Sequence, residues 1–465
     1  MSLPHEVNEE GKDHLVTGYA VLQGSVRLAG PWSRFSLYVE TDDETPQCTP
    51  EQTLLLAGIC EIAATKERYQ KGWRIEVVTN ENPKPLLSRN GPVRVEAFIG
   101  TYGINYGRIS DNIPPPESVV TLLKAAKIKN VRIYDADHSV LKAFKGSGIE
   151  IVVGIGNEFL KDISVNEDRA MDWIKENVEP FLPGTRIRGI AVGNEILGGD
   201  DQELAEVLLG AVKNVYSAID KLKLKDTVQI STDHSEGVFA NSYPPSACTF
   251  KDSVLQYMKP LLEFFSQTGC PFYINAYPFL AYKSDPEHID LNYALFKKNA
   301  GIYDAKTNLH YDNMFDAQVD AAYAALDNAG FSKMNVIVSE TGWASKGDPD
   351  EAGANVENAR TYNLNLLKRL RKKKGTPLRP KIPVKVYVFA LFNENLKPGK
   401  TSERNFGLFK ADGSIAYDIG FTGLKPSSAS KSLLSLKDIR AGGWLMPYSM
   451  VLTTCAAVLL LVLVS

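Results

Sequence analysis

Three glutamates follow apolar, strand-like runs of the sequence, and they are the residues best placed to do chemistry. Glu195 ends one such run, Glu340 lies near the end of a second, and Glu394 comes shortly after a third. Burying a carboxylate at the end of a buried strand costs free energy unless the carboxylate is paired or hydrogen-bonded. Two facing carboxyl groups can break a glycosidic bond, because one protonates the leaving oxygen while the other attacks or stabilises the anomeric carbon. Glu195 and Glu340 are therefore the candidate pair, whereas Glu394 alone is also compatible with a structural role such as a helix cap.

Polar and aromatic side chains near these glutamates suit a sugar substrate. The amide of Asn194, which precedes Glu195, can hydrogen-bond a sugar 2-hydroxyl in the transition state. Sugar rings present flat C–H faces that stack on aromatic side chains, so we expect three aromatic residues to line a cleft: Tyr106, Tyr277 and Trp343. Three more are as compatible with the core as with the cleft: Tyr134, Phe279 and Phe392.

Eight apolar, β-branched runs alternate with helical patterns and predict the elements that position these residues. The runs cover residues 101–107, 130–135, 150–156, 187–195, 228–234, 272–278, 335–343 and 384–392. Near-continuous apolar runs are typical of parallel strands buried on both faces. Eight strand–helix units predict an α/β fold of the (β/α)8 TIM-barrel type, with the active site at the carboxyl ends of the strands. A doubly wound open sheet is the alternative, although such sheets usually have fewer strands.

Apolar residues at helical spacing predict three of the intervening helices. Their stripes are Val119, Val120, Leu122, Leu123 and Ala126; Phe315, Val319, Ala322, Tyr323 and Leu326; and Tyr362, Leu366, Leu367 and Leu370. Glycine readily adopts the left-handed conformation that follows many helices. We therefore expect Gly330 to end the second helix and Gly375 to end the third.

Seven motifs lie between residues 101 and 424: GINYGR, VRIYDAD, AVGNE, INAYPF, VSETGWAS, FALFNENLKPG and ERNFGLF. In these motifs and their order the chain resembles the plant β-1,3-glucanases of glycoside hydrolase family 17. The resemblance implies a (β/α)8 barrel and retaining endo-hydrolysis of β-1,3-glucans such as callose. On the matching positions it implies Glu195 as proton donor and Glu340 as nucleophile. Glu394 and Lys397 correspond to supporting charged residues of the cleft, and their i, i+3 spacing lets the opposite charges approach.

Absent motifs disfavour several other function classes. The sequence contains no G-x-x-x-x-G-K-[ST], G-x-S-x-G, H-E-x-x-H or C-x-x-C pattern, so we expect neither a cofactor nor a metal. Its 52 Lys and Arg residues nearly balance 55 Asp and Glu residues, which argues against a nucleic-acid partner. Two alternatives remain open: a cell-surface glucan-binding protein without turnover, and a transglycosylase in which a sugar replaces water.

The C-terminal sequence is typical of a GPI-attachment signal. A Ser-rich linker at 425–443 precedes an uncharged hydrophobic tail at 444–465, the order of small residues, polar spacer and apolar segment that such signals share. We expect Ser428 to be the attachment site, with a tail-anchored membrane helix as the alternative. We further expect a monomer on the extracellular face of the plasma membrane or in the cell wall.

The N-terminal extension, residues 1–97, carries no recognisable motif. Its first segment, MSLPHEVNEEGKDHLV, is polar and acidic and lacks the apolar run of a signal peptide, although a GPI signal requires entry into the secretory pathway. We interpret the extension as replacing a signal peptide, with a genuine extra domain as the alternative. The barrel is placed at 98–424, where Cys248 and Cys270 are compatible with one disulfide or with two thiols.

Overall fold

The computed structural model describes residues 26–29, 74–77 and 98–424. The chain divides into two compact units, Met1–Gly91 and Pro92–Ser465. In the first unit, strand β1 (Val26–Ala29) pairs antiparallel with strand β2 (Arg74–Val77). The second unit contains the region predicted to form the barrel.

Several predictions concern segments outside the described residues. These are the linker at 425–443, the tail at 444–465 and the attachment site at Ser428. Of the extension at 1–97 only the two short strands are described, and their pairing does not decide between a replaced signal peptide and an extra domain. Among the described helices, none combines the length and the apolar character needed to cross a membrane.

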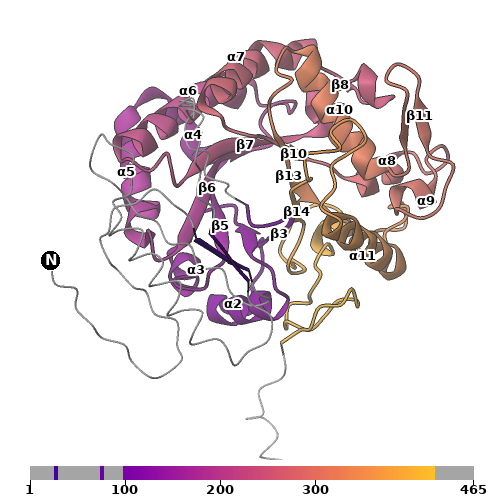
Figure 1. The fold of residues 1–465 in the computed structure, drawn as a ribbon, viewed down its shortest axis with the longest axis horizontal. Helices are drawn as coiled ribbons and strands as arrows, with labels where there is room; N and C mark the ends of the chain where they lie inside the picture. The colour runs from indigo at the N-terminus through magenta and orange to yellow at the C-terminus, as the bar shows by residue number, and fades with distance from the viewer. Residues whose placement is uncertain (1–25, 30–73, 78–97, 425–465) are drawn as a thin grey trace, which may run out of the picture. The chain divides into compact units, whose positions relative to one another are not determined.

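Eight parallel strands close into a barrel in the second unit (Figure 1). They are β3 (Tyr102–Asn105), β4 (Asn130–Arg132), β5 (Glu150–Ile155), β6 (Arg186–Asn194), β7 (Gln229–Ser235), β10 (Phe272–Asn275), β13 (Val336–Thr341) and β14 (Val386–Val388). Strands that follow one another in this series are neighbours, and β14 pairs with β3 to complete the ring. The predicted TIM barrel is confirmed, and the open sheet is excluded because the ring has no edge strand.

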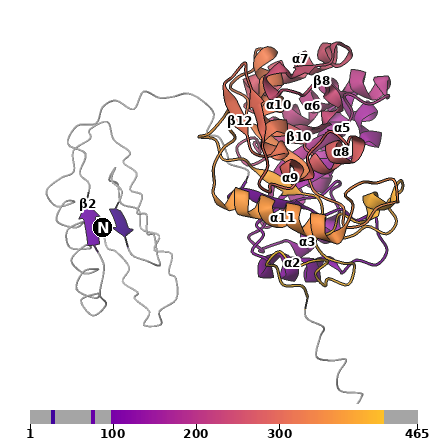
Figure 2. The same ribbon diagram turned by 90° about the vertical axis from the view of Figure 1, so that its right-hand side faces the viewer.

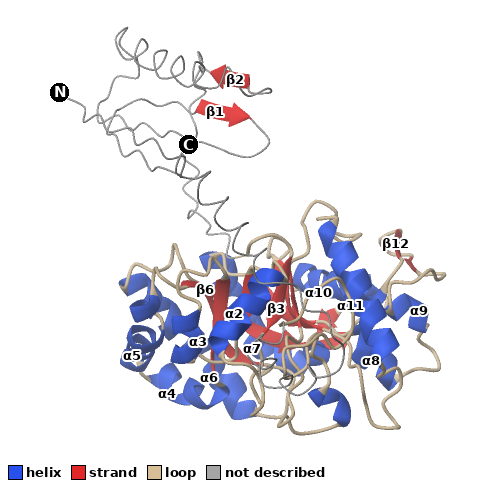
Figure 3. Ribbon diagram, turned by 90° about the horizontal axis from the view of Figure 1, so that it is seen from below, coloured by secondary structure: helices blue, strands red, loops and turns tan. Residues whose placement is uncertain are grey.

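Helices surround the strands on the outside of the barrel (Figure 3). They are α2 (Pro116–Ala125), α3 (His138–Ala143), α4 (Leu160–Val165), α5 (Glu167–Asn177), α6 (Gln202–Lys221), α7 (Asp252–Thr268), α8 (Pro278–Ser284), α9 (Leu291–Ala294), α10 (Met314–Asn328) and α11 (Val356–Arg371). Figure 2 shows α11 on the face of the barrel turned to the viewer. Two short antiparallel pairs lie outside the ring: β8 (Phe239–Asn241) with β9 (Thr249–Phe250), and β11 (Ile302–Asp304) with β12 (Leu309–Tyr311).

Aspartate or asparagine caps the amino end of three long helices. Asp201 precedes α6, Asn313 precedes α10 and Asn355 precedes α11, and each side chain accepts a hydrogen bond from the backbone N–H three residues further on. Such a cap satisfies one of the N–H groups that the first helical turn leaves without a partner, and contributes about 1 kcal/mol. The caps therefore fix where the loops from the strand ends give way to helix.

The two predicted helix ends have different outcomes. Beyond α10, Gly330 has a φ of +94°, the left-handed conformation that was predicted. Beyond α11, Lys373 takes that conformation with a φ of +52°, so the prediction for Gly375 is wrong. Gly375 is needed for a different reason, because an added Cβ would collide with the carbonyl oxygen of Arg379.

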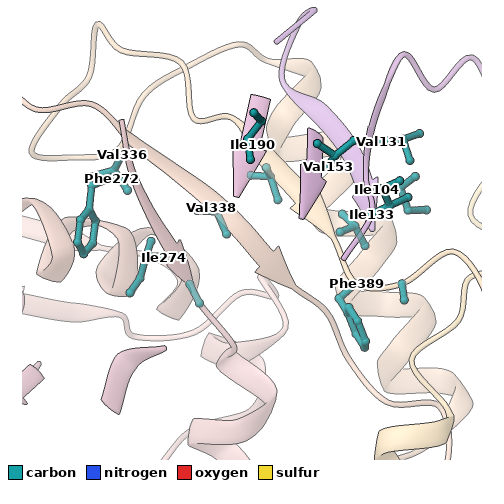
Figure 4. Packing of buried hydrophobic residues seen from close by; sticks show 14 of the residues in the cluster. Ile104, Val131, Ile133, Val153, Ile190, Phe272, Ile274, Val336, Val338 and Phe389 are labelled. Carbon is teal, nitrogen blue, oxygen red and sulfur yellow. The ribbon is translucent and has the colours of Figure 1, made fainter. Parts of the chain in front are cut away.

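Alternate residues along the strands form two separate apolar layers. The outward residues pack against the helices, and Figure 4 labels ten residues of this cluster: Ile104, Val131, Ile133, Val153, Ile190, Phe272, Ile274, Val336, Val338 and Phe389. A second cluster lies inside the barrel and consists of Phe98, Val152, Ala191, Tyr273, Ile337 and Tyr387. Two positions further along their strands, Tyr273 is followed by Asn275 and Ile337 by Ser339. An apolar plug therefore underlies a polar layer at the carboxyl ends of the strands.

No disulfide joins Cys248 to Cys270 in the described barrel. Cys248 is fully buried, and burial raises the pKa of its thiol to about 12. The Thr268 hydroxyl donates to Sγ of Cys270 at 3.3 Å. Of the two arrangements that the sequence left open, the disulfide is thus not the one adopted.

Asp320 in α10 gives the packing of the barrel a pH-dependent test. It is fully buried, its Oδ2 accepts a hydrogen bond from the Leu378 backbone N–H at 2.8 Å, and burial raises its pKa to about 7. An unfolded aspartate titrates near pH 4, so ionisation destabilises the native state progressively between about pH 4 and about pH 7. We expect Asp320→Asn to gain free energy of unfolding relative to the wild type across this range, and to gain no more above it.

Urea unfolding at about pH 4.5 and about pH 7.5 measures this difference. Asp252→Asn is the matched control, because Asp252 is exposed in the first turn of α7. The control should differ from the wild type by a similar amount at both pH values. An advantage of Asp320→Asn that does not grow with pH would contradict the raised pKa.

Candidate active site

Both predicted catalytic glutamates lie next to a break in strand register. Relative to β7, strand β6 accommodates one extra residue just before Asn194, and relative to β14, strand β13 accommodates one extra residue around Glu340. A β-bulge of this kind interrupts the alternation of side chains and turns the residues beside it in a new direction. In both strands the new direction brings a glutamate, Glu195 or Glu340, to polar partners at the barrel mouth.

Three donors hold the carboxylate of Glu340. Oε1 accepts hydrogen bonds from the Tyr134 hydroxyl at 2.7 Å and from Nη1 of Arg132 at 3.0 Å, and Oε2 accepts one from the Tyr277 hydroxyl at 2.7 Å. Burial and the nearby charge of Glu340 raise the pKa of both tyrosines well above the usual range, so both remain donors. The carboxylate is therefore fixed in one orientation. Tyr277, one of the three aromatic residues expected in the cleft, lies beside it, and its stacking on a sugar stays a prediction.

Arg132 connects Glu340 to three other strands from a position that is 1% exposed. Its Nη2 donates to Oδ2 of Asp233 at 2.6 Å and to Oδ1 of Asn194 at 3.0 Å, and Nη1 also reaches Oδ1 of Asn105 at 3.3 Å. Burial opposes the charge of the guanidinium, but the carboxylate of Asp233 and its neighbours raise the pKa of Arg132 well above the usual range. A permanent positive charge therefore lies beside Glu340 and the side chain of Asn194.

The Glu195 carboxyl has a different environment from that of Glu340. Its Oε1 accepts a hydrogen bond from Nδ2 of Asn275 at 2.8 Å. Although Glu195 is exposed at the barrel mouth, the surrounding protein desolvates its carboxyl and raises its pKa, and the negative charge of Glu340 raises it further. One carboxyl with a raised pKa beside another held by donors is the division of roles that glycosidic cleavage requires.

Asn275, at the end of β10, links the two glutamates. It is the strand partner of Glu340 in the β10–β13 pairing, while its amide donates to Glu195. Its Oδ1 accepts a hydrogen bond from the Ser339 hydroxyl at 2.7 Å, which fixes the orientation of the amide. The two carboxyl groups thus belong to one connected network across the barrel mouth.

Glu394 and Lys397 lie in the loop after β14, where their opposite charges approach without forming an ion pair. Oε1 of Glu394 accepts a hydrogen bond from the Ile109 backbone N–H at 2.8 Å, and burial raises the pKa of Glu394. Nζ of Lys397 pairs instead with Oε2 of Glu403 at 3.2 Å and lies 4.3 Å from the ring centroid of Phe389. A supporting role for Glu394 and Lys397 in the cleft stays a prediction.

Two of the aromatic residues expected in the cleft are core residues instead. Trp343 is fully buried and packs against Phe279 with ring centroids 5.2 Å apart. Tyr106 is 1% exposed and packs edge-on against Phe392. Because neither Trp343 nor Tyr106 presents a ring face to solvent, the prediction that they stack on a sugar is wrong.

Among the residues of the network that were not predicted as site residues are Arg132, Asp233 and Asn275. Each lies within an apolar strand run, in the stretches VRIY, ISTDH and INAY. Burying a charge at such a position costs free energy without a partner. The occurrence of Arg132 and Asp233 within apolar runs could therefore have marked them as site candidates. The neutral amide of Asn275 carried no such signal, because buried amides commonly satisfy backbone groups.

A pocket of about 220 Å³ adjoins Asn194 at the ends of β4, β5 and β6. Its lining consists of Arg132, Tyr134, Gly154, Ile155, Gly156, Asn157, Glu158, Ala191, Gly193 and Asn194. Among the described residues, no group of three His, Cys, Asp or Glu side chains is arranged to hold a metal ion. The described residues place carboxyl, amide, guanidinium and phenol groups at this mouth.

A TIM barrel with paired carboxyl groups at the carboxyl ends of its strands defines the class of barrel glycoside hydrolases. The chain belongs to glycosyl hydrolases family 17, whose family model matches residues 102–421. It is a glycosidase, and the resemblance seen in the motifs of the sequence is thereby confirmed at the level of the family.

Plant enzymes are prominent among its relatives. The chain is 49% identical over 324 residues to glucan endo-1,3-beta-glucosidase 14 of Arabidopsis thaliana, covering 70% of this chain and 83% of that protein. It is 50% identical over 321 residues to glucan endo-1,3-beta-glucosidase 11 of the same plant, covering 69% and 75%. Among solved structures, a beta-1,3-glucanase and allergen of Cryptomeria japonica pollen is 39% identical with a TM-score of 0.67, covering 69% of this chain and 99% of the other.

The hydrogen bond from Tyr277 to Glu340 can be tested by removing one oxygen. We expect Tyr277→Phe to lower kcat for glycoside hydrolysis by about 10- to 100-fold, because a hydrogen bond to a charged group contributes about 1.5–3 kcal/mol. The control is Tyr417→Phe, which removes a buried hydroxyl that accepts from Asn363 at 2.9 Å. Steady-state kinetics and thermal melts of both variants separate catalysis from stability. Unchanged turnover in Tyr277→Phe would show that the bond does not orient the carboxylate for reaction.

Proposed function

We propose that the chain catalyses endo-hydrolysis of (1→3)-β-D-glucosidic bonds in β-1,3-glucans such as callose, with retention of anomeric configuration. The observation that carries this proposal is the pairing of Glu340, held by three donors, with Glu195, whose pKa is raised. The names of the two Arabidopsis relatives support the substrate class. Retention requires carboxyl groups about 5–5.5 Å apart. The shared partner Asn275 and the effect of Glu340 on the pKa of Glu195 support a close pair.

In the first step, an oxygen of Glu340 attacks the anomeric carbon and the glycosidic bond breaks. Glu195 gives its proton to the departing oxygen, so the shortened glucan leaves as a neutral alcohol. Arg132, Tyr134 and Tyr277 keep the attacking carboxylate in line. The amide of Asn194, whose Oδ1 is held by Arg132, is available to hydrogen-bond the sugar 2-hydroxyl.

In the second step, water hydrolyses the covalent glycosyl-enzyme. Glu340 carries no charge while it is esterified, so the repulsion that raised the pKa of Glu195 is removed. Glu195 can then remain ionised and take a proton from the incoming water. As that water attacks the anomeric carbon, Glu340 leaves as a carboxylate. Glu195 is then protonated again, as it was before the first step, and the cycle is complete.

Substitution of the two glutamates should produce different defects. Glu340→Gly lacks the nucleophile but keeps the proton donor, so it should lose hydrolysis yet form new β-1,3 bonds from an α-glucosyl fluoride that mimics the missing intermediate. Glu195→Ala should lose about 10²- to 10⁴-fold on glucan, the usual contribution of general acid catalysis. It should keep some activity on aryl glucosides whose leaving group needs no proton, and azide should stimulate it. Product analysis by chromatography and NMR measures both outcomes.

Glu263→Ala, at an exposed position of α7, is the control and should behave as the wild type. Inverted anomeric configuration in a fresh digest would contradict retention, and a fully active Glu195→Ala on β-1,3-glucan would contradict the assignment of the acid. With linear β-1,3-glucan oligosaccharides, products longer than the substrate would indicate a transglycosylase. Binding without any product would indicate a glucan-binding protein.

We also propose that the enzyme acts at the cell surface, attached by a GPI anchor at or near Ser428. The support is the sequence of residues 425–465, where small residues, a polar spacer and an apolar tail follow one another. Phosphatidylinositol-specific phospholipase C should release the protein from intact cells, with detergent extraction as the comparison. Protein that leaves the membrane only with detergent would instead be held by a membrane helix.

A further inference from the structure

The hydrogen-bond ladder between β5 and β6 ends before the segment that carries Glu195. Ile155 and Val192 are the last partners in this ladder, although β6 continues to Asn194. Beyond them the side chain of Asn157 takes the place of strand backbone. The Asn194 backbone N–H donates to Oδ1 of Asn157 at 2.8 Å, and Nδ2 of Asn157 donates to the Asn194 carbonyl at 3.1 Å. The carboxamide therefore continues the ladder by one rung.

The backbone held in this way is left-handed on both sides and strained at Glu195. Gly193 and Glu195, which flank Asn194, have φ values of +73° and +50°. The left-handed conformation costs a residue other than glycine roughly 1–2 kcal/mol, and it persists where the surrounding contacts over-determine it. At Glu195, the backbone N–H donates to the Asp233 carbonyl at 3.0 Å. At Asn194, the two hydrogen bonds of the Asn157 side chain restrain the backbone.

An asparagine is particularly suited to this position. Its carboxamide offers one donor and one acceptor with the chemistry of a peptide group, whereas ionised aspartate offers only acceptors and alanine offers neither. Asn157 begins the short 3-10 helix η1 (Asn157–Phe159) one residue after the end of β5, so its main chain is tied to the barrel. Oδ1 of Asn157 also packs closely on the bulge, since a Cβ added to Gly193 would lie 3.2 Å from this oxygen.

We propose that Asn157 is a positioning residue for Glu195, which holds the Asn194 backbone so that the carboxyl of Glu195 meets the departing glycosidic oxygen. This inference rests on the proposed function, because it assigns Asn157 to the proton-transfer step. Loss of the clamp lets the strained segment relax and moves the proton donor. Glu340 stays in place, because Arg132, Tyr134 and Tyr277 hold it from other strands and loops.

The test compares two substrates of the full-length Asn157→Ala variant. Linear β-1,3-glucan needs protonation of its leaving oxygen, whereas 2,4-dinitrophenyl β-laminaribioside does not. We expect kcat/KM on the glucan to fall about 10- to 100-fold, the effect of a small misplacement of a catalytic group. We expect kcat/KM on the aryl substrate, which covers only the steps up to formation of the glycosyl-enzyme, to stay close to the wild-type value. The ratio of the two kcat/KM values is the readout.

Asn214→Ala is the matched control. Its amide also bridges backbone groups, the carbonyls of Ile163 and Ser164 at 2.8 and 3.1 Å, but it joins α6 to α4 on the outside of the barrel. It should lower stability without changing the ratio of rates. Asn157→Asp keeps the acceptor for the Asn194 N–H and provides the same comparison if the alanine variant does not fold.

The outcomes separate this inference from the proposed function. A wild-type enzyme inactive on β-1,3-glucan would refute the proposed function, and the inference with it. An active wild type with an Asn157 variant that loses both substrates equally would assign Asn157 a structural role only. A rise in KM for both substrates at constant kcat would mean that Asn157 contacts the sugar, and an unchanged variant would mean that the clamp is dispensable. Each of the last three results overturns the inference alone.

Discussion

A single buried guanidinium organises the mouth of the barrel. Arg132, on β4, donates to Asp233, Glu340, Asn194 and Asn105, which lie on β7, β13, β6 and β3. Removing a charge from water costs several kcal/mol unless opposite charges and hydrogen bonds compensate. The cation is tolerated only because the closed ring brings these acceptors around it. The same requirement orients the carboxylate of Glu340, so the stability of the site and its proposed chemistry depend on one network.

A geometric constraint adds to this electrostatic one. In a regular strand successive side chains point to opposite faces, so two neighbouring residues cannot both serve one cavity. The register breaks in β6 and β13 remove this limit next to Glu195 and Glu340. The cost is a left-handed backbone at Glu195. Two contacts offset that cost: the Asp233 carbonyl accepts a hydrogen bond from the Glu195 N–H, and the Asn157 side chain binds the backbone of Asn194.

Environment, more than residue type, distinguishes the two glutamates. Glu340 is surrounded by hydrogen-bond donors. Glu195 accepts one hydrogen bond from an amide, is desolvated by the surrounding protein and lies near the negative charge of Glu340. The apolar plug beneath them excludes water from one side and strengthens each of these electrostatic effects. The distinction matches the proton donor and the nucleophile of the proposed mechanism.

The sequence alone determined the eight strands, the barrel and the candidate pair Glu195 and Glu340, because apolar periodicity and short motifs are local properties of the chain. Tertiary structure decided which side chains meet. Arg132 and Glu340 are 208 residues apart in sequence, and the ring had to close before they could become partners. Burial followed the same logic: Trp343 was recognisable as part of a motif, but only packing against neighbouring elements placed it in the core. The spacing of Lys397 and Glu394 likewise allows them to pair, but in the folded loop Lys397 pairs with the carboxylate of Glu403. Local patterns specify elements, whereas pairings between distant residues depend on closure of the barrel and on the conformations of its loops.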